Sequence, residues 1–99
     1  MGVEVETPQT FYALDIKILG RNTMGKFAIE YSEDGKYFRK VSEFSLNYKE
    51  AGVVETFYFT PVWARSIRLV VLSGNPHIKF EFYYSGGESV KSEATTFIS

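Results

Sequence analysis

Six side chains in the connecting segments of this 99-residue chain have the chemistry to hold a ligand rich in hydroxyl groups. Planar amides, a guanidinium and an imidazole form directional hydrogen bonds, and an aromatic ring packs against the apolar side of a sugar ring. The candidate ligand-binding residues are Arg21, Asn22, Asn47, Tyr48, Asn75 and His77. This set suits a neutral polyol or a protein surface. For each asparagine, a simple role in turn conformation stays open as the alternative.

Alternating apolar and polar residues predict the strands that must position these side chains. Segments such as 12–19 and 77–84 have the period of two that half-buried strands show, and no helix-period segment of useful length occurs. The strand candidates cover residues 3–6, 12–19, 27–32, 37–42, 53–60, 66–72 and 77–84. Short connections rich in Gly, Pro, Asn and Ser separate them. The predicted fold is therefore all-β, an antiparallel β-sandwich of about seven to eight strands.

The segment 27–38, with the sequence FAIEYSEDGKYF, predicts two strands joined by a tight turn. Asp34 and Gly35 supply the positive φ angles that a two-residue hairpin turn requires. Phe38 and Val41 are three positions apart, so they cannot face the same side of a regular strand. We expect a bulge between them.

The order of the connections predicts that three of them meet at one end of the sandwich. Successive connections in an antiparallel sandwich alternate between its two ends. Segments 20–26, 45–52 and 73–77 should therefore share one end, and segments 33–36 and 61–65 the other. The first end contains all six candidate residues.

Composition excludes several classes of function. The 11 basic and 12 acidic residues are interspersed and give a net charge of −1, so no basic face is available for nucleic acid. With no Cys and one His, no motif supplies a nucleophile and base, and we expect neither catalysis nor a cofactor. A structural calcium ion, held by backbone carbonyls and a carboxylate, stays open.

Membrane association is not expected either. No apolar run approaches the roughly 20 residues of a spanning helix. Only Met24 and Leu46 could serve as apolar loop residues, and both have polar neighbours, so lipid insertion is not expected. The first residues show no secretory signal pattern, and the sequence assigns no compartment: a lectin would be extracellular and a scaffold cytoplasmic.

Separated pieces of the chain, in a fixed order from Val3 to Gly86, resemble the discoidin or coagulation factor 5/8 type C domain. This family has a galactose-binding-domain-like jelly-roll sandwich. The pieces are VEVE at 3–6, YALDIKILG at 12–20, YSEDGKYF at 31–38, the F-T-P, A-R and I-R-L groups within 59–69, and HIKFEF at 77–82. The resemblance implies a non-catalytic module that recognises carbohydrate of the galactose type through the loop end that holds the candidate residues.

The chain also departs from the family pattern. The first third of the family domain has no counterpart, Met24-Gly25 replaces an aromatic residue after the first loop, and Phe38 replaces a Trp. We predict a discoidin-like domain over residues 1–86. Residues 87–99 are predicted as a polar tail or linker, with one edge strand left open near its end.

Two functions therefore remain open. One is a carbohydrate-binding or adhesion module, alone or as part of a larger adhesion protein or glycan-active enzyme. The other is a protein interaction subunit or scaffold that docks a protein partner, in which the absent first third would leave an open sheet edge for association.

Overall fold

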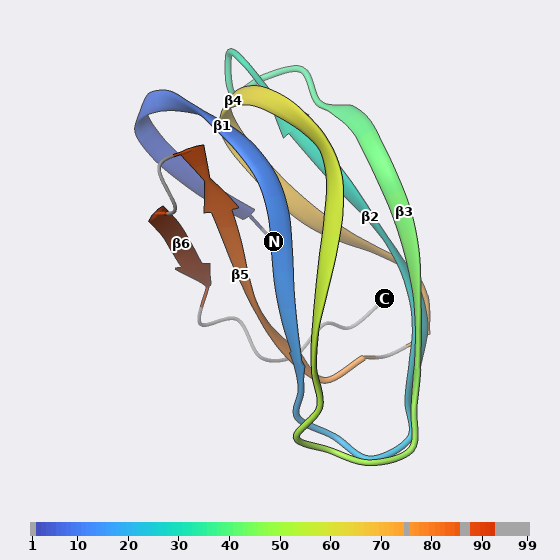
Figure 1. Ribbon diagram of the computed structural model, residues 1–99. Helices are drawn as coiled ribbons and strands as arrows, with labels where there is room; N and C mark the ends of the chain where they lie inside the picture. Colours follow the sequence, from blue (N-terminus) through green and yellow to red (C-terminus); the bar gives the residue numbers. More distant parts are fainter. Residues whose placement is uncertain (1, 75, 86–87, 93–99) are drawn as a thin grey trace.

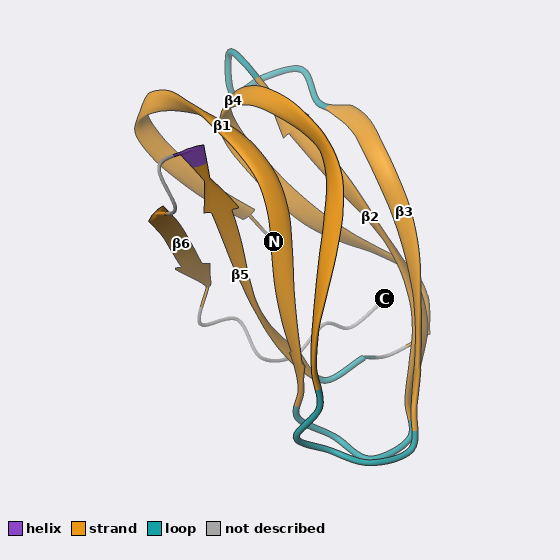
Figure 2. Ribbon diagram, viewed as in Figure 1, coloured by secondary structure: helices purple, strands orange, loops and turns teal. Residues whose placement is uncertain are grey.

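The computed structural model describes residues 2–74, 76–85 and 88–92, and β-strands make up nearly all of them (Figure 2). The strands are β1 (Gly2–Ile18), β2 (Thr23–Ser32), β3 (Arg39–Tyr48), β4 (Val54–Gly74), β5 (Ile78–Tyr84) and β6 (Glu88–Ser92). They form one antiparallel sheet in the order β3-β2-β4-β1-β5-β6. Within these residues, no helix is long and apolar enough to cross a membrane.

The two long strands β1 and β4 bend, so the sheet folds over into two layers (Figure 1). The first layer contains β3, β2, the second half of β4 and the first half of β1. The second layer contains the first half of β4, the second half of β1, β5 and β6. This follows from the pairing, since residues 13–17 of β1 pair with both β4 and β5, whereas the second half of β4 pairs with β2. The predicted antiparallel β-sandwich is confirmed.

The bend coincides with an irregularity in the pairing of β1 and β4. Phe11 pairs with Val62 but Ala13 pairs with Tyr58, so the ladder is interrupted on both strands. Pro61 lies in the unpaired part of β4, and because proline has no backbone N–H, it fits a position where the ladder is broken.

The core lies between the two layers and is rich in phenylalanine. Phe57 of the second layer contacts Phe27 and Phe44 of the first, with ring centroids 5.6 and 4.7 Å apart. Phe82 is fully buried beside Phe11, at 6.3 Å in an edge-on arrangement. The contacts of Phe57 cross between the layers, and together these rings bury large aromatic areas that hold the sandwich closed.

Continuous strands replace two of the connections that the sequence predicted. Predicted strands 3–6 and 12–19 are both parts of β1, and predicted strands 53–60 and 66–72 are both parts of β4. The described residues therefore contain six strands rather than seven or eight. A bulged bend resets the alternation of buried and exposed residues just as a loop does, which is why the pattern alone suggested a break.

The predicted loop at 61–65 is thus wrong, since these residues belong to the bend of β4. Residues 88–92, predicted as part of a polar tail, form β6 and pair with β5. The edge strand considered near residues 95–98 lies outside the described residues. The domain boundary at residue 86 stays a prediction.

The connection between β2 and β3 is longer than predicted. Gly35 has a φ of 80°, but Asp34 does not have a positive φ, so the predicted two-residue turn is wrong. The Asp34 Oδ1 atom instead accepts hydrogen bonds from the Tyr37 N–H (3.0 Å), the Lys36 N–H (2.8 Å) and the Ser32 hydroxyl (2.9 Å). Its side chain, rather than its backbone conformation, organises the turn.

The following strand contains a bulge, but it lies at Val41 rather than between Phe38 and Val41, and Phe38 precedes β3. Ile29 pairs with Ser42 and Glu30 pairs with Lys40, so Val41 is the extra residue on β3. The added residue shifts the inward face of β3 by one position.

We expect the hairpin turn to weaken as the pH falls from about 4 toward 2. The hydrogen bonds from Tyr37, Lys36 and Ser32 lower the pKa of Asp34 to about 2. Because the pKa in the folded state lies below that in the unfolded state, the stabilisation is complete above the unfolded pKa and is lost as pH falls through the folded one. An NMR titration of the Asp34 carboxyl carbon should show a midpoint near 2, and a midpoint near 4 would contradict the turn described here.

Candidate functional site

Three connections meet at one end of the sandwich, at the bottom of Figure 1. They are the β1–β2 connection at 19–22, the β3–β4 connection at 49–53 and the segment that leads from Gly74 into β5. The connection at 33–38 and the bend of the long strands lie at the opposite end. The clustering predicted from the order of connections is confirmed, and we call this cluster the loop end.

Backbone hydrogen bonds fix the three connections to one another. The Leu19 N–H donates to the His77 carbonyl at 2.9 Å, and the Asn22 N–H donates to the Lys49 carbonyl at 3.0 Å. The Gly52 N–H donates to the Ile18 carbonyl at 2.7 Å. The β1–β2 connection thus lies between the other two. These three bonds use backbone groups and not the side chains of Arg21, Asn22 or His77.

Arg21, Asn22 and His77 lie in the connections of the loop end, and Asn75 lies outside the described residues. Asn47 and Tyr48, predicted in a loop at 45–52, are instead the last two residues of β3, beside the loop end, where they pair with Met24 and Thr23 of β2. The side chains of Arg21, Asn22, Asn47 and His77 are exposed. Tyr48 is half-buried and packs against the core, so part of its ring has a structural role.

Asn22 also has a conformational role. Its φ of 54° lies in the left-handed region, which Asn tolerates better than most residues with a Cβ atom. The alternative considered from the sequence, that an asparagine serves the turn, therefore applies to Asn22. Its amide side chain is still exposed at the loop end.

Gly20 lies against His77 and limits where its side chain can be. This role of Gly20 was not identified from the sequence. A Cβ atom on Gly20 would lie 3.1 Å from the His77 Cβ and 3.4 Å from its Nδ1. The buried Thr23 hydroxyl donates to the Gly20 carbonyl at 2.7 Å and holds the loop there. The only signal in the sequence is the Gly at the end of an alternating strand, which does not reveal its neighbour.

A pair of glycines, Gly25 and Gly74, brings β2 and β4 together beside the loop end. A Cβ atom on Gly25 would lie 2.5 Å from the Ser73 carbonyl oxygen, and one on Gly74 would lie 2.2 Å from the Met24 carbonyl oxygen. The end of β4, which leads toward His77, is therefore held directly against β2. Met24 itself remains 57% exposed.

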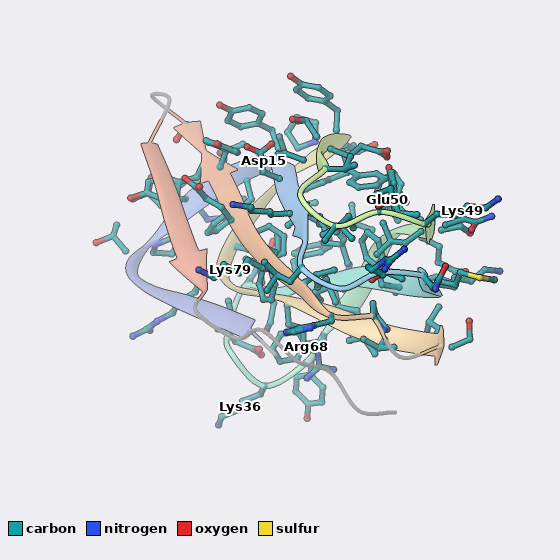
Figure 3. All side chains as sticks on the ribbon, turned by 90° about the horizontal axis from the view of Figure 1, so that it is seen from below. Asp15, Lys36, Lys49, Glu50, Arg68 and Lys79 are labelled. Carbon is teal, nitrogen blue, oxygen red and sulfur yellow. The ribbon has the colours of Figure 1, made fainter. Side chains whose placement is uncertain are left out.

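The loop end carries charges of both signs. Lys49 and Glu50 lie next to each other in the view of Figure 3. Arg21, in the β1–β2 connection, is also exposed. A mixed surface of this kind favours a neutral polar ligand over a polyanion. Among the residues that the structure describes, no group of three or more His, Asp or Glu could hold a metal ion.

The opposite end offers a different depression, of about 270 Å³. It is lined by Tyr31, Ser32, Glu33, Asp34, Tyr37 and Arg39. The Asp34 carboxylate already accepts the hydrogen bonds of the turn, which leaves it less available to a ligand. This depression is best explained as part of the hairpin.

Phe38, which stands where the resembled family has a Trp, has a structural contact. The Arg68 guanidinium lies 3.8 Å above the centre of its ring. Arg68 also forms an ion pair with Glu30 at 2.7 Å. Phe38 therefore covers an ion pair between β2 and β4.

Comparison with known proteins agrees with this fold. Residues 2–84 match the model of the F5/8 type C domain family. A similar solved structure is that of CpGH89CBM32-5 from Clostridium perfringens in complex with GalNAc-β-1,3-galactose, with 25% sequence identity and a TM-score of 0.59. The similarity covers 98% of this chain but 63% of the clostridial chain, so this chain spans less than two thirds of that length. No curated protein was found to match.

Proposed function

Since this chain belongs to the F5/8 type C domain family, whose model matches residues 2–84, we propose that it is a non-catalytic carbohydrate-binding module. The proposed ligand is a glycan of the galactose type, and the proposed site is the loop end. The clostridial structure similar to this chain holds a galactose-containing disaccharide, which supports this ligand class. The observation that carries the proposal is the exposure of amide, guanidinium and imidazole groups on loops fixed by backbone hydrogen bonds.

The side chains of the loop end would divide the work of recognition. Arg21 donates hydrogen bonds to hydroxyl oxygens, and the amides of Asn22 and Asn47 both donate and accept. His77 adds an imidazole whose position Gly20 defines. Tyr48, half-buried, offers the exposed part of its ring to the apolar side of a sugar. Asn75 belongs to the proposed set by its place in the sequence.

Arg21→Ala should weaken binding of GalNAc-β-1,3-galactose at least tenfold, which corresponds to about 1.4 kcal/mol, and His77→Ala should weaken it severalfold. Loss of one hydrogen bond to a charged group such as the Arg21 guanidinium costs about 1.5–3 kcal/mol, and loss of one to a neutral group costs about 0.5–1.5 kcal/mol. Calorimetric titration measures the affinity, and amide shifts at Asn22, Lys49 and His77 locate the ligand.

Lys36→Ala, an exposed change at the opposite end, serves as the matched control and should leave the affinity unchanged. If galactose, N-acetylgalactosamine and the disaccharide all fail to bind the folded protein at millimolar concentration, the proposed function is wrong.

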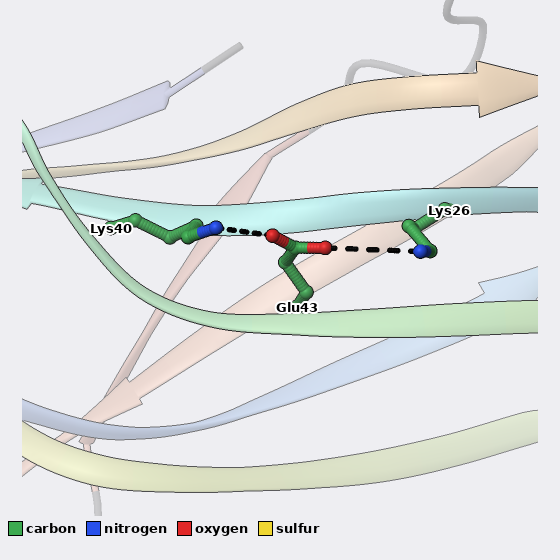
Figure 4. Close-up of polar contacts among 3 residues, drawn as sticks. All are labelled: Lys26, Lys40 and Glu43. Carbon is green, nitrogen blue, oxygen red and sulfur yellow. Dashed lines mark hydrogen bonds and ion pairs between the residues drawn. The ribbon is translucent and has the colours of Figure 1, made fainter.

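The alternative role as a partner-docking scaffold gains no support from the edge strand β3. Glu43 on this strand contacts Lys40 and lies 4.0 Å from Lys26 (Figure 4). The hydrogen bond from Lys40 lowers the pKa of Glu43, so the charge is retained. Charged side chains and the bulge at Val41 both oppose pairing with another strand. Association of this chain with a partner through an open sheet edge therefore stays a prediction, which size-exclusion chromatography can test by detecting a stable complex.

A further inference from the structure

A tyrosine-lined cleft lies on the outer face of the second layer, away from the core. Its volume is about 240 Å³. The residues that line it are Tyr12, Ala13, Asp15, Thr56, Tyr58 and Tyr83. None of them belongs to the loop end. Tyr58 is exposed, and Tyr12 and Tyr83 are half-buried. Aromatic groups that gather at one accessible place can mark a binding surface.

The pairing of three strands builds the cleft. Ala13 of β1 pairs with Tyr58 of β4 on one side and with Tyr83 of β5 on the other. Residues directly opposite one another in antiparallel strands share a face, so the two tyrosines flank the alanine. Tyr58 is 72% exposed while Ala13 is 2% exposed. The small alanine is therefore the floor, and the tyrosines are the walls.

The spacing of the walls leaves room for one ring between them. Tyr58 and Tyr83 start from strands two steps apart, which is about 9–10 Å at the usual strand spacing. A ring held between two others needs contact distances of about 3.5–4.0 Å on each side. The cleft is also smaller than the roughly 300–1,000 Å³ of pockets for larger ligands, so it fits a single sugar unit.

A fixed carboxylate closes one end of the cleft. The Thr56 hydroxyl donates to Asp15 Oδ1 at 2.6 Å, and the Tyr83 hydroxyl donates to Asp15 Oδ2 at 2.8 Å. The hydrogen bond to Asp15, together with burial and nearby charges, raises the pKa of Tyr83 to about 12, so this phenol donates at neutral pH. Each carboxylate oxygen keeps a further lone pair for a ligand hydroxyl. Figure 3 shows Asp15 beside β1 and β5.

The charges around the cleft favour a neutral ligand over an ion. Asp15 of β1 pairs with Glu81 of β5. Two residues further along, on the same outer face, Lys17 pairs with Lys79. Two negative and two positive side chains therefore lie side by side, and neither a cation nor an anion is attracted overall. Tyrosine walls beside a carboxylate would also suit a quaternary ammonium group, so choline is included in the test below.

The outer face of the first layer has a different character. It carries the ion pair of Glu30 with Arg68 and the contacts of Glu43 with Lys26 and Lys40. On this face, ion pairs between strands take the place that the tyrosine cleft has on the second layer.

We propose that the cleft over Ala13 is a second glycan-binding site, which takes one pyranose unit of a neutral oligosaccharide. Tyr58 and Tyr83 pack against the apolar faces of the sugar ring, and Asp15 accepts hydrogen bonds from two of its hydroxyl groups. The inference goes beyond the loop end and does not depend on it. With two sites on one domain, a long glycan chain can bind with higher avidity than either site provides.

Titration of the 15N-labelled protein with GalNAc-β-1,3-galactose, cellohexaose and mannohexaose tests the inference. We expect at least one of these sugars to shift the amides of Ala13, Asp15 and Thr56. Tyr58→Ala should lower the affinity of this site at least tenfold and leave shifts at the loop end unchanged. Asp15→Asn should lower it severalfold, since the amide keeps the shape but loses one acceptor. Tyr37→Ala, which removes a tyrosine 79% exposed at the opposite end, is the matched control.

The outcomes separate this inference from the proposed function. Shifts at the loop end alone overturn the second site and leave the proposed function intact. Shifts at the cleft alone support the second site and contradict the loop end. If no sugar of the panel shifts either place in the folded protein, both proposals are wrong. If choline shifts the cleft in a way that depends on Tyr58 and no sugar does, the cleft binds cations and the inference is overturned.

Discussion

Replacing Phe82 with alanine is expected to lower the free energy of unfolding by about 3–5 kcal/mol. Phe82 is fully buried and its ring contacts those of Phe11, Phe59 and Phe80. The substitution removes the buried aromatic area and leaves a cavity between the two layers. Domains of this size are stable by about 5–15 kcal/mol, so the loss is a large fraction of the total.

Urea unfolding followed by Trp63 fluorescence gives the free energy of unfolding for the Phe82→Ala variant. The midpoint should fall while the slope with denaturant stays the same. Tyr37→Ala is the control, because a residue 79% exposed should change stability by no more than about 0.5 kcal/mol. A loss below about 1 kcal/mol for Phe82→Ala would mean that this position is not in the packed core.

Gly74→Ala is the second substitution with a large expected effect, about 2–5 kcal/mol of lost stability. The backbone at Gly74 has a φ of 80°, where a Cβ atom is strained. The added methyl group would also lie 2.2 Å from the Met24 carbonyl oxygen and 2.7 Å from the Gly25 Cα. Both contacts are with backbone, which cannot move aside without separating β2 from β4.

Gly52→Ala separates the cost of a positive φ angle from the cost of a steric clash. Gly52 has a φ of 94° but no atom within 4 Å of the added Cβ, so only the conformational cost of about 1–2 kcal/mol applies. The difference between the two variants in chemical unfolding measures the effect of the close approach. Equal losses would show that β2 and β4 can move apart at this point.

The layered fold was predictable because its signals are local. Segments 12–19 and 77–84 alternate apolar and polar residues, and the Gly and Asn residues between strands mark where the chain turns. The shared end of the three loops followed from the antiparallel order alone. The bends of β1 and β4 were missed because a bulge that keeps a strand continuous changes the pattern of buried residues in the same way as a loop.

The parts of the site that sequence reasoning missed depend on partners distant in the chain. Gly25 and Gly74 face each other only because β2 pairs with the end of β4. The tyrosine cleft needs Tyr58 and Tyr83 to lie opposite the same alanine, which is a matter of register. Register between strands 25 residues apart or more cannot be read from either strand alone. The loop positions of Arg21 and His77 followed from the order of the connections, and their role in ligand binding stays a prediction.

The continuity of β1 and β4 through both layers has a consequence for folding. Each layer contains one half of β1 and one half of β4, so both strands are shared between the layers. Gly2, at the start of β1, pairs with Arg68 in the second half of β4. The two halves therefore cannot unfold as independent units, and the chain should gain or lose its structure in a single cooperative transition. Pairings between such distant residues must form late, which makes folding of this domain slow compared with helical proteins of similar length.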